Sequence, residues 1–266
     1  MDKLARIESS VEFLMLNFEF QLQNSSLKLL KSDLESARLT KKFQNAFSKK
    51  SPLVSVIIPA SRSLEIVERA TESVLGQSYE NLEILLVCDR KREDIIQWLK
   101  KKRNKKIKVL QNNSYPDFAE IEPYRMWAQA GGSSRNLGMQ KSQGEFTTFV
   151  DDDDEMLPNK IEACVTTAQE NAIELVGHFQ GKLNSKGKLE KFRANKVNKT
   201  QKYLSGSKDS LGLNTNSIFM HRWFNRILWP SYNYQSLRGI DKSYIAMLFL
   251  LEPRFKFIDE ILVIRN

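Results

Sequence analysis

The sequence predicts an α/β protein with an open, mostly parallel, Rossmann-like β-sheet and helices on both faces. From Pro52 onwards, short apolar runs alternate with stretches of helical periodicity. The runs are nearly continuously apolar, which is typical of parallel strands buried between two helix layers. Of the 266 residues, 41% are hydrophobic, so the chain can bury the core that such a sheet requires.

The expected elements follow one another in β-α order. Strands are expected at 53–58, 82–87, 107–110 and 146–150, and helices at 64–77, over IIQWLKK, within GGSSRNLGMQKSQG and over PNKIEACVTTAQEN, which opens with Pro158 in its first turn. Ser63 stands where a helix N-cap belongs, and Gly76 stands where the same helix should end. Beyond residue 172 the pattern is mixed. We expect a strand over IELVGHFQ, a turn at NSKG, a strand and helix over IFMHRWFNRIL, and a helix over DKSYIAMLFLL.

Residues 1–50 differ from the main domain, which we place at 51–266. This segment contains no Gly or Pro, and its apolar side chains recur at intervals of three and four: Phe13, Leu16, Phe20, Leu27, Leu30 and Leu34. The pattern predicts an amphipathic helical extension. Two roles stay open for it, packing against the main domain or contact with a second copy or a membrane surface.

The net charge of +9 is concentrated in two segments. Residues 90–108 contain ten basic and two acidic side chains, and residues 182–202 contain eight and one. Such segments favour polyanions, for example an anionic membrane surface, although solvated helix and hairpin faces have the same composition. Only Trp98 and Phe192 interrupt them, so the stacking aromatics that single-stranded nucleic acid needs are scarce. No specific nucleic-acid partner is expected.

Several classes of protein are excluded by what the chain lacks. No apolar run approaches the ~20 residues that a membrane-spanning helix requires, and the N-terminus has no signal-peptide core. We therefore expect a cytoplasmic protein, with peripheral membrane contact as an open alternative. Cys88 and Cys164 are far apart, and the chain has only two histidines, which argues against a disulfide framework and a zinc site.

Polar side chains follow the predicted parallel strands where ligands bind in open α/β sheets. The first strand is followed by Ser61, the second by Asp89, the third by Asn112, and the fourth by the acidic run 151–155. An acidic run is often only a solvated loop. A calcium loop is rejected because Met156 stands where that loop needs Gly. Carboxylates fixed at a strand end favour Mg²⁺ or Mn²⁺ completed by a diphosphate.

Three segments resemble family-2 glycosyltransferases with the GT-A fold: VSVIIPAS, ESVLGQSYENLEILLVCD and GGSSRNLGMQKSQGEFTTFVDDDDEMLPNKIE. The last is the most specific, because these residues keep the family's order and spacing: Arg135, Asn136, Gly138, Gly144, Glu145, Asp151, Asp153, Asp154 and Pro158. The resemblance implies a nucleotide-sugar-binding half at 51–171 and an acceptor-binding half at 172–266. It also implies metal-dependent, inverting transfer of a sugar from a nucleotide-diphosphate donor to a hydroxyl of a glycan, lipid-linked or protein-linked acceptor, as in polysaccharide biosynthesis.

The resemblance assigns donor-side roles residue by residue. Asp89 matches the acid that binds the nucleotide base, which favours uridine weakly, although Cys88 replaces the family's first acid there. Asp151 and Asp153 match the aspartate-x-aspartate metal motif, with Asp153 as the direct ligand of Mn²⁺ or Mg²⁺ and Asp151 facing the sugar or ribose. Arg135 either holds a donor oxygen or braces the acidic run. The remaining donor-side residues are Pro59, Ser61 and Asn136.

The acceptor side is matched less closely. The family's catalytic base is the second acid of a Glu-Asp pair, which corresponds here to Asp241 behind Ile240. Asp241 is therefore the candidate base, and an N-cap of the following helix is its alternative role. Acceptor-side candidates are His221, Trp229 and Tyr232. Two other functions stay open: a non-catalytic relative that binds glycan or polyanion, and a nucleotidyltransferase, for which PASRSLE lacks the expected Gly-rich phosphate loop.

Overall fold

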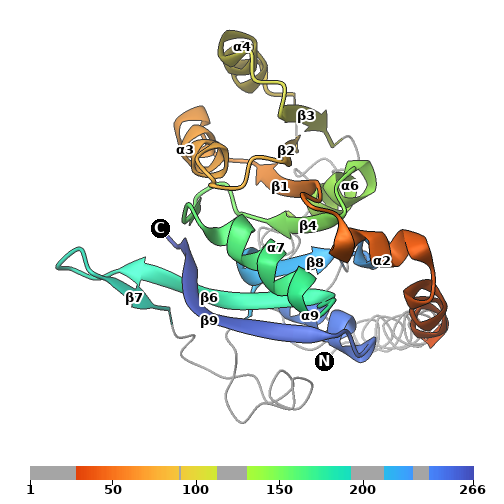
Figure 1. The fold of residues 1–266 in the computed structure, drawn as a ribbon. Coiled ribbons are helices and arrows are strands. Elements are labelled where there is room, and N and C mark those ends of the chain that lie inside the picture. The colour runs from red at the N-terminus through yellow and green to blue at the C-terminus, as the bar shows by residue number, and fades with distance from the viewer. Residues whose placement is uncertain (1–27, 90, 113–130, 193–212, 230–239) are drawn as a thin grey trace, which may run out of the picture.

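The computed structural model describes residues 28–89, 91–112, 131–192, 213–229 and 240–266 (Figure 1). Within these ranges, the centre is a nine-stranded sheet in the order β3-β2-β1-β4-β8-β6-β9-β5, with β7 paired to β6. The first four predicted strands are present as β1 (Val54–Ala60), β2 (Leu82–Cys88), β3 (Ile107–Gln111) and β4 (Phe146–Phe149). They are parallel to one another, so all four end at the same edge of the sheet.

Helices cover both faces of this parallel half. They are α3 (Leu64–Leu75), α4 (Glu93–Lys102), α6 (Gly132–Lys141) and α7 (Lys160–Glu170). Successive residues of β1 point to opposite sides: Val56 and Ile58 pack in the core that includes α3, α4 and α7, whereas Ile57 packs in the core that includes α6. The α/β arrangement therefore agrees with the predicted one. One boundary differs, because α7 begins after Pro158 and Asn159 rather than at the proline.

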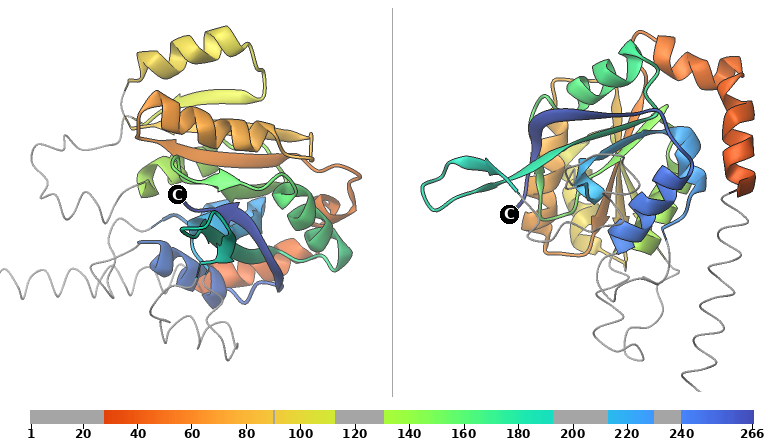
Figure 2. Two further views of the ribbon diagram at one scale, coloured as in Figure 1. Left: turned by 90° about the vertical axis from the view of Figure 1, so that its left-hand side faces the viewer. Right: turned by 90° about the horizontal axis from the view of Figure 1, so that it is seen from below.

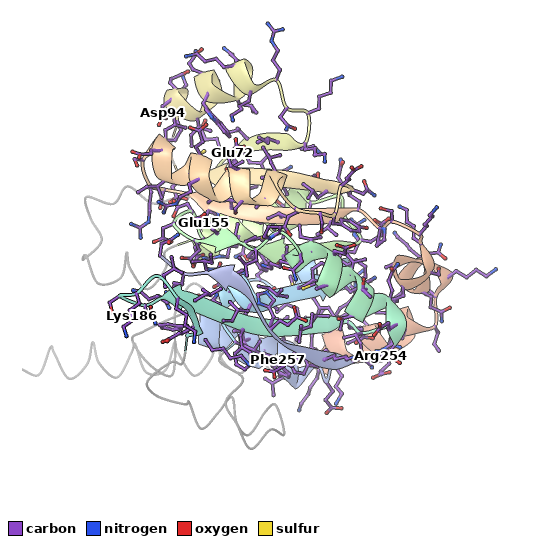
Figure 3. All side chains as sticks on the ribbon, turned by 60° about the vertical axis from the view of Figure 1, so that its left-hand side comes forward. Glu72, Asp94, Glu155, Lys186, Arg254 and Phe257 are labelled. Atoms are coloured by element: carbon purple, nitrogen blue, oxygen red, sulfur yellow. The ribbon has the colours of Figure 1, made fainter. Side chains whose placement is uncertain are left out.

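The second half of the sheet is mixed. The strands β6 (Leu175–Leu183) and β8 (Ile218–His221) were expected, whereas β5 (Glu155–Met156), β7 (Leu189–Lys191) and β9 (Phe255–Ile264) were not. β8 runs antiparallel to β4, so the short helix η2 (Thr215–Ser217) that precedes it lies at the edge where β4 ends. The β6–β7 hairpin, with Lys186 in its turn, projects from the body (Figures 2 and 3).

Two further helices complete the described part. After β8 the chain forms the short helix η3 (Arg222–Arg226), and α9 (Ile240–Leu250) covers the same face of the sheet as α6. In the described ranges, no helix combines the length and the apolar character needed to cross a bilayer.

The N-terminal segment packs against the main domain where the structure describes it. Residues 28–38 are helical, and α2 (Lys41–Ser48) follows, with the Thr40 hydroxyl accepting a hydrogen bond from Phe43 N at 3.2 Å. Leu34 and Phe43 are buried in the core beneath α6 and α9. This agrees with the packing role for residues 28–50. Phe13, Leu16, Phe20 and Leu27 lie outside the described residues.

A buried carboxylate joins this segment to the sheet. Glu174 accepts hydrogen bonds from Arg38 Nε and Nη2 at 2.7 and 2.6 Å, and from Arg254 Nε at 2.9 Å. Burial acts to raise the pKa of Glu174, but the hydrogen bonds from Arg38 and Arg254 outweigh it and hold the pKa below its usual value. Arg254 stands just before β9 (Figure 3), so the three side chains connect the N-terminal helices, β6 and β9.

Replacing Glu174 by Gln is expected to lower the free energy of unfolding by about 3 kcal/mol, because it leaves two arginines facing a neutral buried partner. Urea unfolding followed by circular dichroism measures the change. Glu252→Gln is the matched control, since Glu252 pairs with Lys31 at the surface, and its effect should stay below about 0.5 kcal/mol. Equal effects of the two substitutions would contradict this account.

Candidate active site

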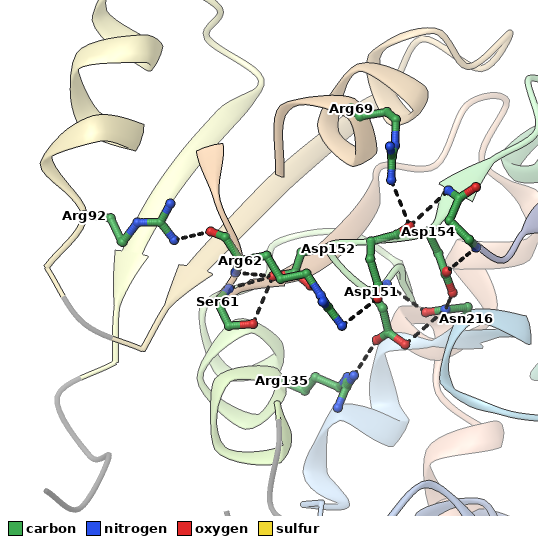
Figure 4. A network of polar contacts seen from close by, with 11 residues as sticks. Ser61, Arg62, Arg69, Arg92, Arg135, Asp151, Asp152, Asp154 and Asn216 are labelled. Carbon is green, nitrogen blue, oxygen red and sulfur yellow. Dashed lines mark hydrogen bonds and ion pairs between the residues drawn. The ribbon is translucent and has the colours of Figure 1, made fainter. Parts of the chain in front are cut away.

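The acidic residues 151–154 follow β4 after one residue, Val150, and lie between the end of β1 and the start of β8 (Figure 4). Asp152 faces β1. One of its carboxylate oxygens accepts hydrogen bonds from Ser61 N at 2.7 Å, Ser61 Oγ at 3.1 Å and Arg62 N at 2.8 Å. Asp152 is buried, so it fastens the β1 loop to the acidic run and is turned away from Asp151.

Asn216 holds the other side of the acidic run. Its amide oxygen accepts a hydrogen bond from Asp151 N at 2.8 Å, and its amide nitrogen donates to Asp151 Oδ2 at 3.2 Å and Asp154 Oδ2 at 2.5 Å. Asp154 is buried, and burial together with the charge of Asp151 raises its pKa to about 7. Asp154 therefore supports the loop from behind.

Lys160 fixes the backbone under this loop. Its fully buried ammonium donates to Phe149 O at 3.3 Å and to Asn216 O at 2.8 Å. Burial lowers the pKa of Lys160 to about 8. One side chain from α7 thus ties the last residue of β4 to η2, and the positions of Asp151 and Asn216 depend on it.

The sequence predicted neither Asn216 nor Lys160. The signal for Asn216 was the polar run NTNS before the apolar strand IFMH. The rule that ligands bind beyond the carboxyl ends of parallel strands points only to residues that follow such strands. An antiparallel strand brings its starting residues to the same edge, so the residues before β8 also belong to the site.

Arg135 braces the acidic run. Its Nη2 lies 2.5 Å from Asp151 Oδ1, and its guanidinium lies 4.8 Å from the centre of the Trp229 ring. Trp229 is held in place by Asn136, whose amide oxygen accepts from Trp229 N at 2.8 Å and whose nitrogen donates to Trp229 O at 3.1 Å. The structure therefore brings Arg135, Asn136, Asp151 and Trp229 together.

Asp89 lies next to the start of α6. Its carboxylate accepts a hydrogen bond from the Ser134 hydroxyl, and Asn112 Nδ2 donates to Ser133 Oγ at 2.9 Å and to Ser134 Oγ at 3.2 Å. The ends of β2 and β3 thereby meet α6, the helix that also carries Arg135. Cys88 is the buried last residue of β2, and burial raises the pKa of its thiol to about 11, so it does not replace the charge of an acid.

Asp241 reaches the same site from α9. Burial raises the pKa of its carboxyl, the charge of Arg135 lowers it, and the charge of Asp151 raises it. These neighbours place Asp241 beside the Arg135–Asp151 ion pair. It lies inside the first turn of α9, so the N-cap alternative for this residue is wrong.

Comparisons with known proteins agree with this arrangement. Residues 55–228 match glycosyl transferase family 2, which is more than half of the chain. The chain belongs to glycosyl transferase family 2. Crystal structures of S. aureus TarS share the fold: the one of TarS 1–349 in complex with UDP superposes with a TM-score of 0.60 at 19% identity, over 80% of this chain and 60% of that one. The predicted family and GT-A-like fold class are confirmed.

The similarity to relatives whose names state a donor or an acceptor covers a smaller part of the chain. The chain is 29% identical over 130 residues to the GalNAc(5)-diNAcBac-PP-undecaprenol beta-1,3-glucosyltransferase of Campylobacter jejuni, covering 48% of this chain and 38% of that protein. It is 30% identical over 129 residues to the UDP-Glc:alpha-D-GlcNAc-diphosphoundecaprenol beta-1,3-glucosyltransferase WfgD of Escherichia coli, covering 48% and 46%. The chain thus spans less than half the length of these relatives.

One acceptor-side prediction, His221, falls elsewhere in this family-2 chain. His221 pairs with Phe146 at the opposite end of β4, its ring packs 4.1 Å from that of Phe43, and burial lowers its pKa to about 4. The structure therefore does not bring His221 to the acidic run but places it in the core. Tyr232 lies outside the described residues.

The carboxylate oxygens of the acidic run at this family-2 site fit a hard divalent cation. Among the described residues, no three His, Cys, Asp or Glu side chains are grouped to hold a metal ion. A Mg²⁺ or Mn²⁺ ion that also binds a nucleotide diphosphate needs only one or two carboxylates, because diphosphate oxygens and water complete its coordination. Burial and the charges of Asp151 and Asp152 raise the pKa of Asp153, although Arg62 lowers it. A cation at Asp153 would relieve this unfavourable charge.

Proposed function

We propose that this chain transfers a sugar from a UDP-sugar to a hydroxyl acceptor, with inversion at the anomeric carbon and with Mn²⁺ or Mg²⁺ at Asp153. The observation that carries the proposal is the convergence of Asp151, Arg135 and Asp241, which come from β4, α6 and α9. A base and an acidic run at one sheet edge are the parts that displacement of a diphosphate requires.

In the proposed mechanism, Pro59 near the end of β1, Ser61 just after that strand and the carboxylate of Asp89 hold the nucleotide. Asp151 faces the ribose or sugar and is kept in place by Arg135 and Asn216. Asp153 would hold the cation, which would neutralise the leaving diphosphate. Asp241 accepts the proton of the acceptor hydroxyl while the hydroxyl oxygen attacks the anomeric carbon and the bond to the diphosphate breaks.

The relatives suggest the kind of substrate. The two named glucosyltransferases act on diphosphoundecaprenol-linked saccharides, and two of the TarS structures are complexes with UDP and with UDP-GlcNAc. We therefore propose a UDP-hexose or UDP-N-acetylhexosamine donor and a lipid-linked saccharide acceptor. The cytoplasmic location predicted from the sequence stays a prediction.

A donor screen tests the proposal. Purified protein with MnCl₂ and a panel of UDP-sugars, with ADP-glucose as the control nucleotide, should release UDP slowly from one donor, and UDP should raise the melting temperature only when Mn²⁺ is present. NMR of the transferred product should show a β linkage from an α-linked donor. Absence of both UDP release and any nucleotide-dependent thermal shift would favour the non-catalytic alternative.

We further propose that α4 contacts an anionic membrane surface. The exposed cations Lys100, Arg103 and Lys105 surround the apolar side chains of Ile96, Leu99 and Val109 in a surface groove of about 460 Å³. α4 and β3 lie at one end of the sheet, remote from the β6–β7 hairpin (Figures 1 and 2). Cations above an apolar groove suit lipid phosphates and the acyl chains beneath them.

The triple substitution Lys100→Glu, Arg103→Glu and Lys105→Glu is expected to abolish co-sedimentation with phosphatidylglycerol vesicles, because each basic side chain contributes about 1 kcal/mol to such binding. The matched control reverses Lys182, Lys186 and Lys188 on the hairpin and should sediment like the wild type. Loss of sedimentation in the control alone would place the contact on the hairpin and refute the role of α4. None of the three proteins (the wild type, the α4 variant and the hairpin control) should bind phosphatidylcholine vesicles.

A further inference from the structure

Arg62 occupies the carboxylate that the proposed function assigns to the cation. Its Nη2 lies 2.7 Å from Asp153 Oδ2, and its Nε lies 3.4 Å from Asp152 Oδ1 (Figure 4). The Asp153 side chain is about one-third exposed and the Arg62 side chain about half exposed, so both are reachable from solvent. This ion pair has no role in the proposed mechanism.

The backbone of Arg62 is fixed although its side chain is exposed. Arg62 N donates to Asp152 Oδ2 at 2.8 Å, and Arg62 O accepts from Arg92 Nη1 at 2.7 Å. Arg92 is itself held by two hydrogen bonds to Asp94, at 2.9 and 2.7 Å. The guanidinium can therefore swing on a long side chain about a fixed point at the end of β1.

A metal ion and this guanidinium compete for Asp153. Mg²⁺ binds carboxylate oxygens at about 2.0–2.1 Å and needs ideal geometry, which the Arg62 Nη2 at Oδ2 obstructs. A bound diphosphate changes the balance, because a guanidinium forms paired hydrogen bonds to phosphate oxygens as readily as to a carboxylate. Phosphate oxygens next to the cation would lie within reach of the Arg62 side chain.

We propose that Arg62 is a positioning residue that neutralises Asp153 in the donor-free protein and transfers to the donor diphosphate when the cation binds. The inference rests on the proposed function, since it requires a cation at Asp153. As a consequence, the metal alone binds weakly. The metal releases the Arg62 guanidinium from Asp153 and the nucleotide diphosphate binds it, so each ligand raises the affinity for the other.

The test is titration of Mn²⁺ by electron paramagnetic resonance, without and with UDP, on the wild type and Arg62→Gln. Without UDP, the variant should bind Mn²⁺ about two- to fivefold more tightly, the range expected for loss of a partly exposed ion pair. With Mn²⁺ saturating, calorimetry should show that the variant binds UDP about tenfold more weakly. The factor by which UDP tightens Mn²⁺ binding should fall accordingly.

Arg69→Gln is the matched control. Arg69 is also half exposed and pairs with Glu155 at 3.1 Å, so its loss removes one positive charge near the same loop without freeing the Asp153 carboxylate. Its effects on Mn²⁺ and UDP should stay within about twofold. Equal effects of the two substitutions would mean that the loss of any positive charge near this loop has the same result, which would overturn the proposal.

The outcomes separate this inference from the proposed function. If wild type and Arg62→Gln bind Mn²⁺ equally and UDP equally, the role of Arg62 is refuted while metal-dependent UDP binding still stands. If neither protein binds Mn²⁺ even with saturating UDP, the metal assignment itself fails and the inference fails with it. Tighter Mn²⁺ binding combined with weaker UDP binding in Arg62→Gln alone supports the exchange.

Discussion

Asp241→Asn should lower the turnover number for sugar transfer by about 10²- to 10⁴-fold, the range that a general base contributes. The substitution keeps the size of the side chain but removes the oxygen that accepts the proton. Affinity for Mn²⁺ and UDP should stay within about twofold, because the cation is assigned to Asp153. Steady-state kinetics with the donor found in the screen, together with calorimetry of UDP binding, measure both quantities.

The control for this variant is Asp259→Asn, which removes an acid from β9 that pairs with Lys191 at the surface. It should leave turnover unchanged. The pH profile gives a second check. Because the pKa of Asp241 is raised by burial, the wild-type rate should fall with decreasing pH at a higher pH than an ordinary aspartate would give, and the variant should lack this dependence. A variant with near-normal turnover would exclude Asp241 as the base.

Asp153→Asn is expected to remove the dependence of UDP binding on Mn²⁺ and to lower transfer by about 10³-fold. Loss of a metal that stabilises the leaving diphosphate costs several kcal/mol, and each 1.36 kcal/mol corresponds to a factor of ten. Thermal shift with UDP, with and without MnCl₂, measures binding, and UDP release measures the rate. A wild-type thermal response in this variant would move the cation to another residue.

Glu155→Gln provides a matched control for Asp153→Asn. Glu155 is the last acid in the run, but its carboxylate is held by Arg69 at 3.1 Å and accepts from Asn266 Nδ2 at 3.0 Å. The substitution removes the same amount of charge from the same loop without freeing a ligand position. Its Mn²⁺-dependent UDP affinity should stay within about twofold of the wild type, and an effect as large as that of Asp153→Asn would indicate a loss of local charge rather than of a ligand.

Local pattern accounts for much of the fold and for part of the site. The strands β1 to β4 and their helices could be predicted because apolar runs and helical periodicity are encoded within a few neighbouring residues. Asp89 and Asp151 follow strands in the parallel half of the sheet, so their common edge also followed from the order of elements. The ten-residue strand β9 was missed because its charged residues, Lys256, Asp259 and Glu260, interrupt the apolar pattern.

The contacts that set the site's geometry depend on residues distant in the sequence. Asn216 reaches Asp151 only because β8 runs antiparallel to β4, and the same reversal carries His221 to the far end of that strand. Lys160 lies on α7 and supports the loop through its buried ammonium. Composition does not predict that this lysine is buried. Residue order thus sufficed for the parallel elements and the strand-end acids, because those signals are local. Strand direction and burial decided which other side chains meet them, since both arise only when remote segments pack together.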